Sequence, residues 1–286
     1  MTAAAQQEMR YPDFLCIGAQ KAGTTWLDAN LRRHPQIWMP WIKELQFFND
    51  VHIPAHRAWT GRHRWQHAEK AARRLVRRAE DKPLDMTILH RITSIGTSSV
   101  SDDWYGRIFA HARADQVCGE VTPEYSLLPV QGIEHVKRLN PELKIIFLLR
   151  DPVDRCWSHL RMLAKNHTKL DLLQAAQSSD VLDRSNFVSI YQKWVSIFGF
   201  DKIYLSCLKN IAETPCEFLG DICRFLGISV HSKINLSAYE PVFVGERLEM
   251  PEAIRAVLER RLERVRDEMR ALPIRRVPMV AAGVGS

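Results

Sequence analysis

The sequence has 286 residues, 46% of them hydrophobic and 26% charged, a balance typical of a soluble globular protein with a sizeable core. The formal net charge of +7 favours anionic ligands, but no nucleic-acid-binding motif accompanies it, so no nucleic-acid partner is expected. Six cysteines without a C-x-x-C pair argue against a metal site or a disulfide framework. No apolar run reaches the roughly 18 residues of a membrane span, and no secretion signal is evident, so we expect a cytoplasmic protein.

Strand-like and helix-like segments alternate along the chain. A buried strand is predicted at residues 14–17, and a helix follows it at 24–33. The further predicted strands are 117–121, 144–149 and 202–208, and the further predicted helices are 152–165, 187–198, 214–227 and 251–272. This alternation predicts an α/β fold with a P-loop-like central parallel β-sheet flanked by helices.

One domain over residues 1–286 is the preferred organisation. Within it, residues 1–12 are expected to be a disordered lead-in, residues 51–116 a variable insertion, and residues 273–286 a frayed tail. The insertion contains an Arg/His/Trp-rich run at 56–80, which is either a solvated amphipathic face or the wall of a groove for an acidic ligand. The last predicted helix carries an apolar stripe that is expected to pack on the domain, a dimer-forming coil being the alternative. The oligomeric state stays open.

The stretch "GAQKAGTTWL" joins the first predicted strand to the first predicted helix. Gly18 and Gly23 have the spacing of a nucleotide-triphosphate loop, but Thr24 stands where that loop has its lysine, and Lys21 lies inside the loop. Backbone N–H groups and the positive end of a helix hold anions, and Thr24 and Thr25 can cap the helix or donate their hydroxyl groups. The loop therefore favours one phosphate that carries a small group. The alternative is a turn that binds nothing.

A second motif begins at the strand with the strongest signal. Arg150 directly follows that strand, where open α/β sheets place their ligands, and Ser158 lies about two helical turns further on. A guanidinium and a helix hydroxyl in this arrangement can grip a second phosphate. The alternative is that Arg150 pairs with Asp151 or Asp154 and that Ser158 is an ordinary helix residue.

A third motif, "KELQFFND", contains a candidate base. Phe47 and Phe48 follow Glu44 closely and could form an apolar wall beside its carboxylate. Loss of water would raise the pKa of this carboxylate into a range useful for a general base. The alternative is an exposed glutamate on a solvated turn.

Together, these motifs resemble those of the sulfotransferase family that uses 3′-phosphoadenosine-5′-phosphosulfate (PAPS), in particular its bacterial members and its heparan-sulfate-type O-sulfotransferase branch. "GAQKAGTTWL" is similar to the family's 5′-phosphosulfate loop, and "LLRDPVDRCWSHL" is similar to its 3′-phosphate motif. "KELQFFND" resembles the segment with the catalytic glutamate, and "GEVTPEYS" resembles a further motif of the heparan branch. The likeness covers about residues 14–50 and 117–228.

The resemblance implies a sulfotransferase fold and transfer of a sulfuryl group from PAPS, the co-substrate, to a hydroxyl of a carbohydrate or small metabolite. It implies that Glu44 is the general base, that Lys21 assists the transfer, and that Arg150 and Ser158 hold the 3′-phosphate. The residues implied to hold the 5′-phosphate end are Lys21, Ala22, Gly23, Thr24, Thr25 and Trp26. No metal is expected, because Lys21 and the loop N–H groups meet the charge that develops on the leaving phosphate. The insertion at 51–116 then lies on the acceptor side.

The sequence departs from the family pattern in places. Val121 stands where the heparan branch usually has a lysine, and Phe187 stands where a tyrosine is expected. The cofactor-closing loop is assigned to "VFVGERLEMP", with Gly245 and Arg247 as candidate contacts.

Two other functions stay open. One is a P-loop-type small-molecule kinase with Asp151 as its metal-binding acid, which Thr24 in the lysine position disfavours. The other is a non-catalytic protein that binds anions or glycans on the same fold. The acceptor itself is not identified by the sequence.

Overall fold

A computed structural model describes residues 9–80, 82–166, 169–230 and 248–275. Its centre is one sheet of five strands, all parallel, in the order β2-β3-β1-β4-β5. The strands are β1 (Phe14–Gly18), β2 (Ile37–Trp38), β3 (Val117–Val121), β4 (Lys144–Leu149) and β5 (Ile203–Cys207). The predicted α/β fold with a central parallel sheet is confirmed. Only β2, which has two residues and therefore no periodicity to detect, was not predicted.

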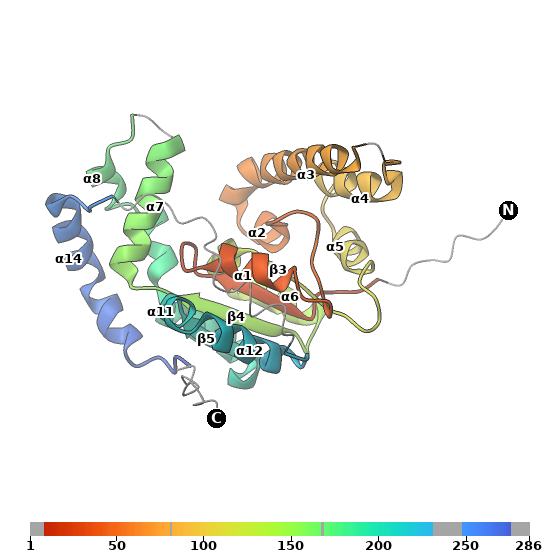
Figure 1. Cartoon of the computed structure of the whole chain (residues 1–286). Coiled ribbons are helices and arrows are strands. Elements are labelled where there is room, and N and C mark those ends of the chain that lie inside the picture. The colour runs from red at the N-terminus through yellow and green to blue at the C-terminus, as the bar shows by residue number, and fades with distance from the viewer. Residues whose placement is uncertain (1–8, 81, 167–168, 231–247, 276–286) are drawn as a thin grey trace, which may run out of the picture.

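Helices flank this sheet on both faces (Figure 1). The longer helices are α1 (Thr24–Leu31), α3 (Arg57–Ala79), α4 (Met86–Thr97), α5 (Asp102–Phe109), α6 (Val130–Leu139), α7 (Pro152–Asn166), α10 (Phe187–Phe198), α12 (Pro215–Leu226) and α14 (Glu252–Met269). The shorter ones are α2 (Phe47–His52), α8 (Leu172–Ala175), α9 (Ser179–Leu182) and α11 (Leu208–Glu213), with 3₁₀ turns η1 (Pro54–His56), η2 (Pro123–Leu127), η3 (Asp183–Ser185) and η4 (Phe200–Lys202). Within the described residues, no helix is long and apolar enough to cross a membrane.

Aromatic contacts define the two layers of helices. On one face, Trp26 of α1 lies 6.0 Å from Phe218 of α12, measured between ring centroids. On the other face, Phe147 of β4 lies 6.2 Å from Phe187 of α10, which also contacts α6. Successive side chains of a strand point to opposite faces, so a strand covered on both sides must be apolar throughout.

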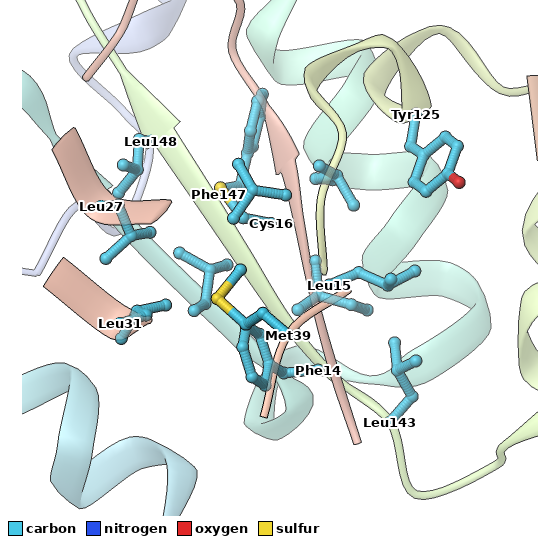
Figure 2. Packing of buried hydrophobic residues seen from close by; sticks show 14 of the residues in the cluster. Phe14, Leu15, Cys16, Leu27, Leu31, Met39, Tyr125, Leu143, Phe147 and Leu148 are labelled. Carbon is cyan, nitrogen blue, oxygen red and sulfur yellow. The ribbon is translucent and has the colours of Figure 1, made fainter. Parts of the chain in front are cut away.

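The central strands satisfy this requirement. Every side chain of β1 is buried, as are those of β4 from Ile145 to Leu149. Figure 2 shows Phe14, Leu15 and Cys16 of β1 among side chains from α1, β4 and the loop after β3. This packing fixes the ends of β1, β3 and β4, from which the loops of the candidate site emerge.

The last helix packs on the domain, as its apolar stripe predicts. Ile254, Leu258 and Leu262 of α14 are buried in one cluster with Val153 and Leu160 of α7. Figure 1 shows α7 and α14 side by side at one end of the sheet.

Both ends of the described chain are more closely attached than expected. Residues 9–12, placed by the sequence in a disordered lead-in, pack on the domain instead: the Arg10 side chain pairs with Asp13 at 2.7 Å, and its backbone N–H donates to the Gly106 carbonyl at 3.3 Å. In the segment expected to be a frayed tail, the Arg275 N–H donates to the Leu205 carbonyl of β5 at 2.9 Å. Backbone hydrogen bonds to the body of the domain therefore order these residues.

The insertion forms helices beside α2 (Figure 1). α3 and α4 are an antiparallel pair, and Gly96 of α4 allows them to approach closely, because a Cβ there would lie 2.8 Å from the Cβ of Ala68. Ala68, Ile92 and Ile95 belong to the same buried cluster as the sheet.

Candidate functional site

Three loops meet at the carboxyl edge of the sheet, after β1, β3 and β4. The first requires both of its glycines. Gly18 has φ +137°, and a Cβ there would lie 3.1 Å from the Pro123 carbonyl oxygen. Gly23 has φ +91°, and a Cβ there would lie 2.9 Å from methyl groups of Leu208 and Ile211. A side chain at either position would push the loop away from its supports, so this backbone is specific to glycine.

The helix after this loop begins without a side-chain cap. Gly23 is the N-cap residue, whereas Thr24 and Thr25 are already helical, so the expected capping by threonine is not observed. Thr25 instead accepts a hydrogen bond from the Lys43 ammonium at 3.2 Å. Ala22, Thr24 and Trp26, all predicted contacts of the 5′-phosphate end, have buried side chains. The first N–H groups of any helix have no partner within the helix, so those at the start of α1 suit an anion.

Cations gather around Lys21. Burial lowers the pKa of the Lys21 ammonium, and the positive charges of Arg161, Arg150 and Lys165 lower it further. The Arg150 guanidinium donates to the Lys21 carbonyl oxygen at 3.2 Å, and burial lowers its own pKa as well. The structure thus brings two predicted binding residues together, on loops from neighbouring strands.

Asp151, one of the two alternative partners for Arg150, has another role. One carboxylate oxygen of Asp151 accepts the N–H groups of Val153 and Asp154 at 2.9 and 3.1 Å and so caps α7, while the other pairs with Arg266 of α14 at 3.2 Å. Asp151 is therefore committed to holding the end of a helix.

One face of α7 extends the cation cluster. Ser158, Arg161 and Lys165 are spaced i, i+3 and i+7, so they share a face of the helix. Ser158 is 9% exposed, and the charges of Arg161 and Lys165 act on Lys21. Neither Arg161 nor Lys165 was predicted from the sequence, although their spacing from Ser158 was a signal that could have found them.

The segment that contains Glu44 lies against the start of α1, where the ammonium of the neighbouring Lys43 contacts Thr25. The partly buried carboxylate of Glu44 accepts a hydrogen bond from the Gln46 amide at 2.6 Å. Burial raises the pKa of Glu44 to about 7, the nearby charges of Glu124 and Glu120 raise it too, and Lys43 opposes them. A carboxyl group with this pKa can accept a proton near neutral pH.

The two phenylalanines predicted to wall Glu44 pack elsewhere. Phe47 stacks on Tyr105 with ring centroids 4.5 Å apart, and Phe48 meets Tyr125 edge-on at 5.3 Å. Both open α2 with their rings in the core. The expectation of a raised pKa agrees with the structure, but the contacts that the structure gives Glu44 come from Gln46 and from α3.

A buried network holds the backbone that follows Glu44. Glu120 of β3 accepts hydrogen bonds from the hydroxyl groups of Tyr105, Thr122 and Tyr125 at 2.6, 2.6 and 2.8 Å, and from the Leu45 N–H at 3.3 Å. The Tyr125 hydroxyl also accepts the Phe47 N–H at 3.1 Å. These bonds satisfy a fully enclosed carboxylate and fix residues 45–47 to the sheet.

A second buried carboxylate ties the first loop to the other side of the site. Glu124 accepts a hydrogen bond from the Gln20 amide at 3.1 Å and pairs with Arg184, whose Nη2 lies 3.0 Å from Oε2. Arg184 also pairs with Asp180 of α9 at 2.8 Å. Glu120 and Glu124 both come from "GEVTPEYS", so this motif is a structural support.

Three further features of the sequence concern metal ligands, Phe187 and the assigned closing loop. Within residues 9–80, 82–166, 169–230 and 248–275, no group of three or more His, Cys, Asp or Glu side chains is placed to hold a metal ion. Phe187, found where a tyrosine was expected, is buried against Phe147. Gly245 and Arg247 of the assigned closing loop lie outside the described residues.

The sequence and the fold are similar to those of known proteins. The model of the sulfotransferase family matches residues 12–232. A sulfotransferase from Alicyclobacillus acidocaldarius has a similar structure, with a TM-score of 0.57 and 21% identity over 88% of this chain and 96% of that one. The sulfotransferase domain of the Synechococcus PCC 7002 olefin synthase gives a TM-score of 0.57 and 17% identity over 95% and 92% of the two chains. The sulfotransferase domain of the curacin biosynthetic pathway gives 0.56 and 16% over 95% of each.

No curated protein sequence matches the chain. At these identities the solved structures establish the shared fold, while the family model spans well over half of the sequence. The chain belongs to the sulfotransferase family.

Proposed function

We propose that the protein transfers a sulfuryl group from PAPS to a hydroxyl group of a carbohydrate or small metabolite, with Glu44 as the general base. The observation that carries this proposal is the pairing of opposite perturbations in one site. The partly buried cations Lys21 and Arg150 have lowered pKa values. Glu44, whose neighbour Lys43 contacts Thr25 at the start of α1, has a pKa raised to about 7. Such pairs of perturbed groups are typical of sites that bind a charged ligand and move a proton.

The cation cluster fits the donor. Lys21 and the N–H groups at the start of α1 would hold the 5′-phosphate end with Thr24 and Thr25, while Arg150 and Ser158 would hold the 3′-phosphate. Each neighbouring cation repels the protonated form of Lys21. Negatively charged phosphate and sulfate oxygens bound among these cations would offset that repulsion. Arg150 already contacts the Lys21 backbone, so a ligand that binds one of these residues would also affect the position of the other.

The proposed reaction is an in-line displacement at sulfur. Glu44 takes the proton from the acceptor hydroxyl as the acceptor oxygen forms a bond to sulfur. The bond between sulfur and the bridging phosphate oxygen breaks, and adenosine 3′,5′-bisphosphate leaves with that electron pair. Lys21 and the N–H groups of α1 meet the negative charge that develops on the leaving phosphate. They supply the positive charge that Mg²⁺ supplies in a kinase.

The proposal is tested by following labelled sulfur. The protein is incubated with PAPS carrying radiolabelled sulfur and a panel of sugars, alcohols and phenols, and also with ATP and Mg²⁺. We expect label to reach a hydroxyl acceptor from PAPS and EDTA to leave the rate unchanged. Phosphoryl transfer from ATP, abolished by EDTA, would instead establish the kinase. Binding of adenosine 3′,5′-bisphosphate without any transfer would favour a binding protein.

A further inference from the structure

The long helix of the insertion contacts the peptide group that carries Glu44. Nε2 of His63 accepts a hydrogen bond from the Glu44 N–H at 3.4 Å. His67, one turn further along α3, lies near Lys43, whose backbone and ammonium both affect the pKa of its imidazole. The two imidazole rings stack with centroids 4.1 Å apart and planes inclined by 21°. Two histidines thus lie against the Lys43–Glu44 peptide.

Other contacts fix α3 relative to this peptide. Arg64, only 6% exposed, pairs with Asp50 at 2.7 Å and donates to the Gln46 carbonyl at 3.1 Å. Thr60 donates to the same Asp50 carboxylate at 2.5 Å. The helix is therefore attached to the segment just after Glu44, and the histidines cannot shift without breaking a buried ion pair.

Burial opposes protonation of both rings. Burial lowers the pKa of His63 to about 3, and the neighbouring groups His67, Arg64 and Lys70 oppose its protonation too. Burial and Lys70 also lower the pKa of His67, and Lys43 faces it from the opposite segment. A neutral imidazole keeps a lone pair for the Glu44 N–H, whereas a charged one has only donors. The contact therefore persists over the pH range in which Glu44 titrates.

From this geometry we propose that His63 and His67 are positioning residues for Glu44. They orient the peptide that bears the base and so keep its carboxyl group in its partly buried position. This inference rests on the proposed function, because it assigns the insertion a part in the same proton transfer. It also explains why an arginine-rich helix presents histidines toward Glu44.

The experiment compares two variants that differ by one methylene group. In His63→Gln, the side-chain amide reaches the position of Nε2 and can accept the Glu44 N–H; in His63→Asn it falls short. Gln66→Ala, an exposed change on the same helix, is the matched control. The pKa of Glu44 is measured by NMR on protein with ¹³C-labelled glutamate, with the signal assigned through Glu44→Gln. Turnover with PAPS and the affinity for adenosine 3′,5′-bisphosphate are measured in parallel.

We expect His63→Asn to lower the pKa of Glu44 by about one unit, to shift the acid limb of the kcat profile with it, and to reduce kcat about tenfold. His63→Gln and Gln66→Ala should keep both, and all variants should bind adenosine 3′,5′-bisphosphate like the wild type. If His63→Asn does not fold, His67→Ala serves instead, with a smaller shift in the same direction.

An unchanged Glu44 pKa in His63→Asn, or in its substitute, overturns the inference, as does an equal loss in His63→Gln. The titration needs no donor, so it decides on the histidines even if the wild type fails to use PAPS. That second result would count against the proposed function alone.

Discussion

The two halves of the candidate site respond to burial in opposite ways. On the donor side, the first loop and α7 crowd cations together, and burial lowers the pKa values of Lys21 and Arg150. On the proposed acceptor side, the carboxyl group of Glu44 is partly buried, and this burial raises its pKa to about 7. In both halves the charged form is disfavoured in the free protein.

The difference lies in what restores the charge. The donor-side cations gain from an anionic ligand, so binding energy is available there. Glu44 has Lys43 as its only favourable charge among the leading contributions, with Glu120, Glu124 and Asp28 against it. The Glu44 carboxylate can therefore take up a proton near neutral pH, as a general base must. In the proposed mechanism, the repulsion among the cations favours binding of an anion, and the burial of Glu44 favours proton transfer.

Removing the base should have the largest effect. Replacing Glu44 with Gln keeps an acceptor for the Gln46 amide but cannot take up a proton. We expect kcat to fall by about 10²- to 10⁴-fold, while the affinity for adenosine 3′,5′-bisphosphate measured by calorimetry stays within about twofold. Retention of wild-type turnover would show that another group is the base.

The donor-side cations should separate turnover from binding. Lys21→Ala removes the charge nearest the leaving phosphate, so we expect kcat/KM to fall by about 10²- to 10³-fold. Arg150→Ala removes a phosphate contact and should weaken calorimetric binding of adenosine 3′,5′-bisphosphate by roughly 30-fold, about 2 kcal/mol. If both variants bound adenosine 3′,5′-bisphosphate as tightly as the wild type, neither Lys21 nor Arg150 would contribute to binding the nucleotide.

The sequence predicted the placement of the first loop and of Arg150 better than the surroundings of Glu44, for a physical reason. Strand β1, the glycine turn and Arg150 follow one another within short segments, so local patterns report them directly. His63 of α3 contacts Glu44 from 19 residues away along the chain, and Glu120 of β3 contacts the next residue, Leu45, from 75 residues away. Periodicity can show that α3 is amphipathic, but not that His63 faces Glu44.

The errors follow the same division. The sequence indicated that the pKa of Glu44 would be raised but attributed this to Phe47 and Phe48, whose rings enter the core. Residues 9–12 were expected to be disordered because the stretch offers no pattern, whereas the contacts of Arg10 are long-range. Tertiary contacts of this kind leave no local signal.

The raised pKa of the Glu44 carboxyl group should also make the protein less stable as the pH rises. The folded protein holds the Glu44 proton up to about pH 7, whereas the ordinary value is 4.5. The unfolded state therefore loses this proton first, and the unfolding free energy falls as pH rises through that interval. Glu44→Gln lacks this effect. We expect it to match the wild type near pH 4 and to exceed it above pH 8 by at most about 3 kcal/mol in urea denaturation. A difference that does not vary with pH would contradict the raised pKa.

The smallest effects should come from the outer cations of α7. The charges of Arg161 and Lys165 lower the pKa of Lys21 by electrostatic repulsion. Arg161 also interacts with a second neighbour, since its guanidinium lies 5.9 Å from the Trp157 ring centroid. We expect Arg161→Ala to weaken binding of adenosine 3′,5′-bisphosphate about tenfold and Lys165→Ala to weaken it by less, with both losses shrinking at high salt. Arg264→Ala is the control, because Arg264 is 88% exposed on α14 and pairs with Glu268. If that control weakened binding as much as Arg161→Ala does, the effect would follow the overall positive charge, and α7 would have no specific part in the donor side.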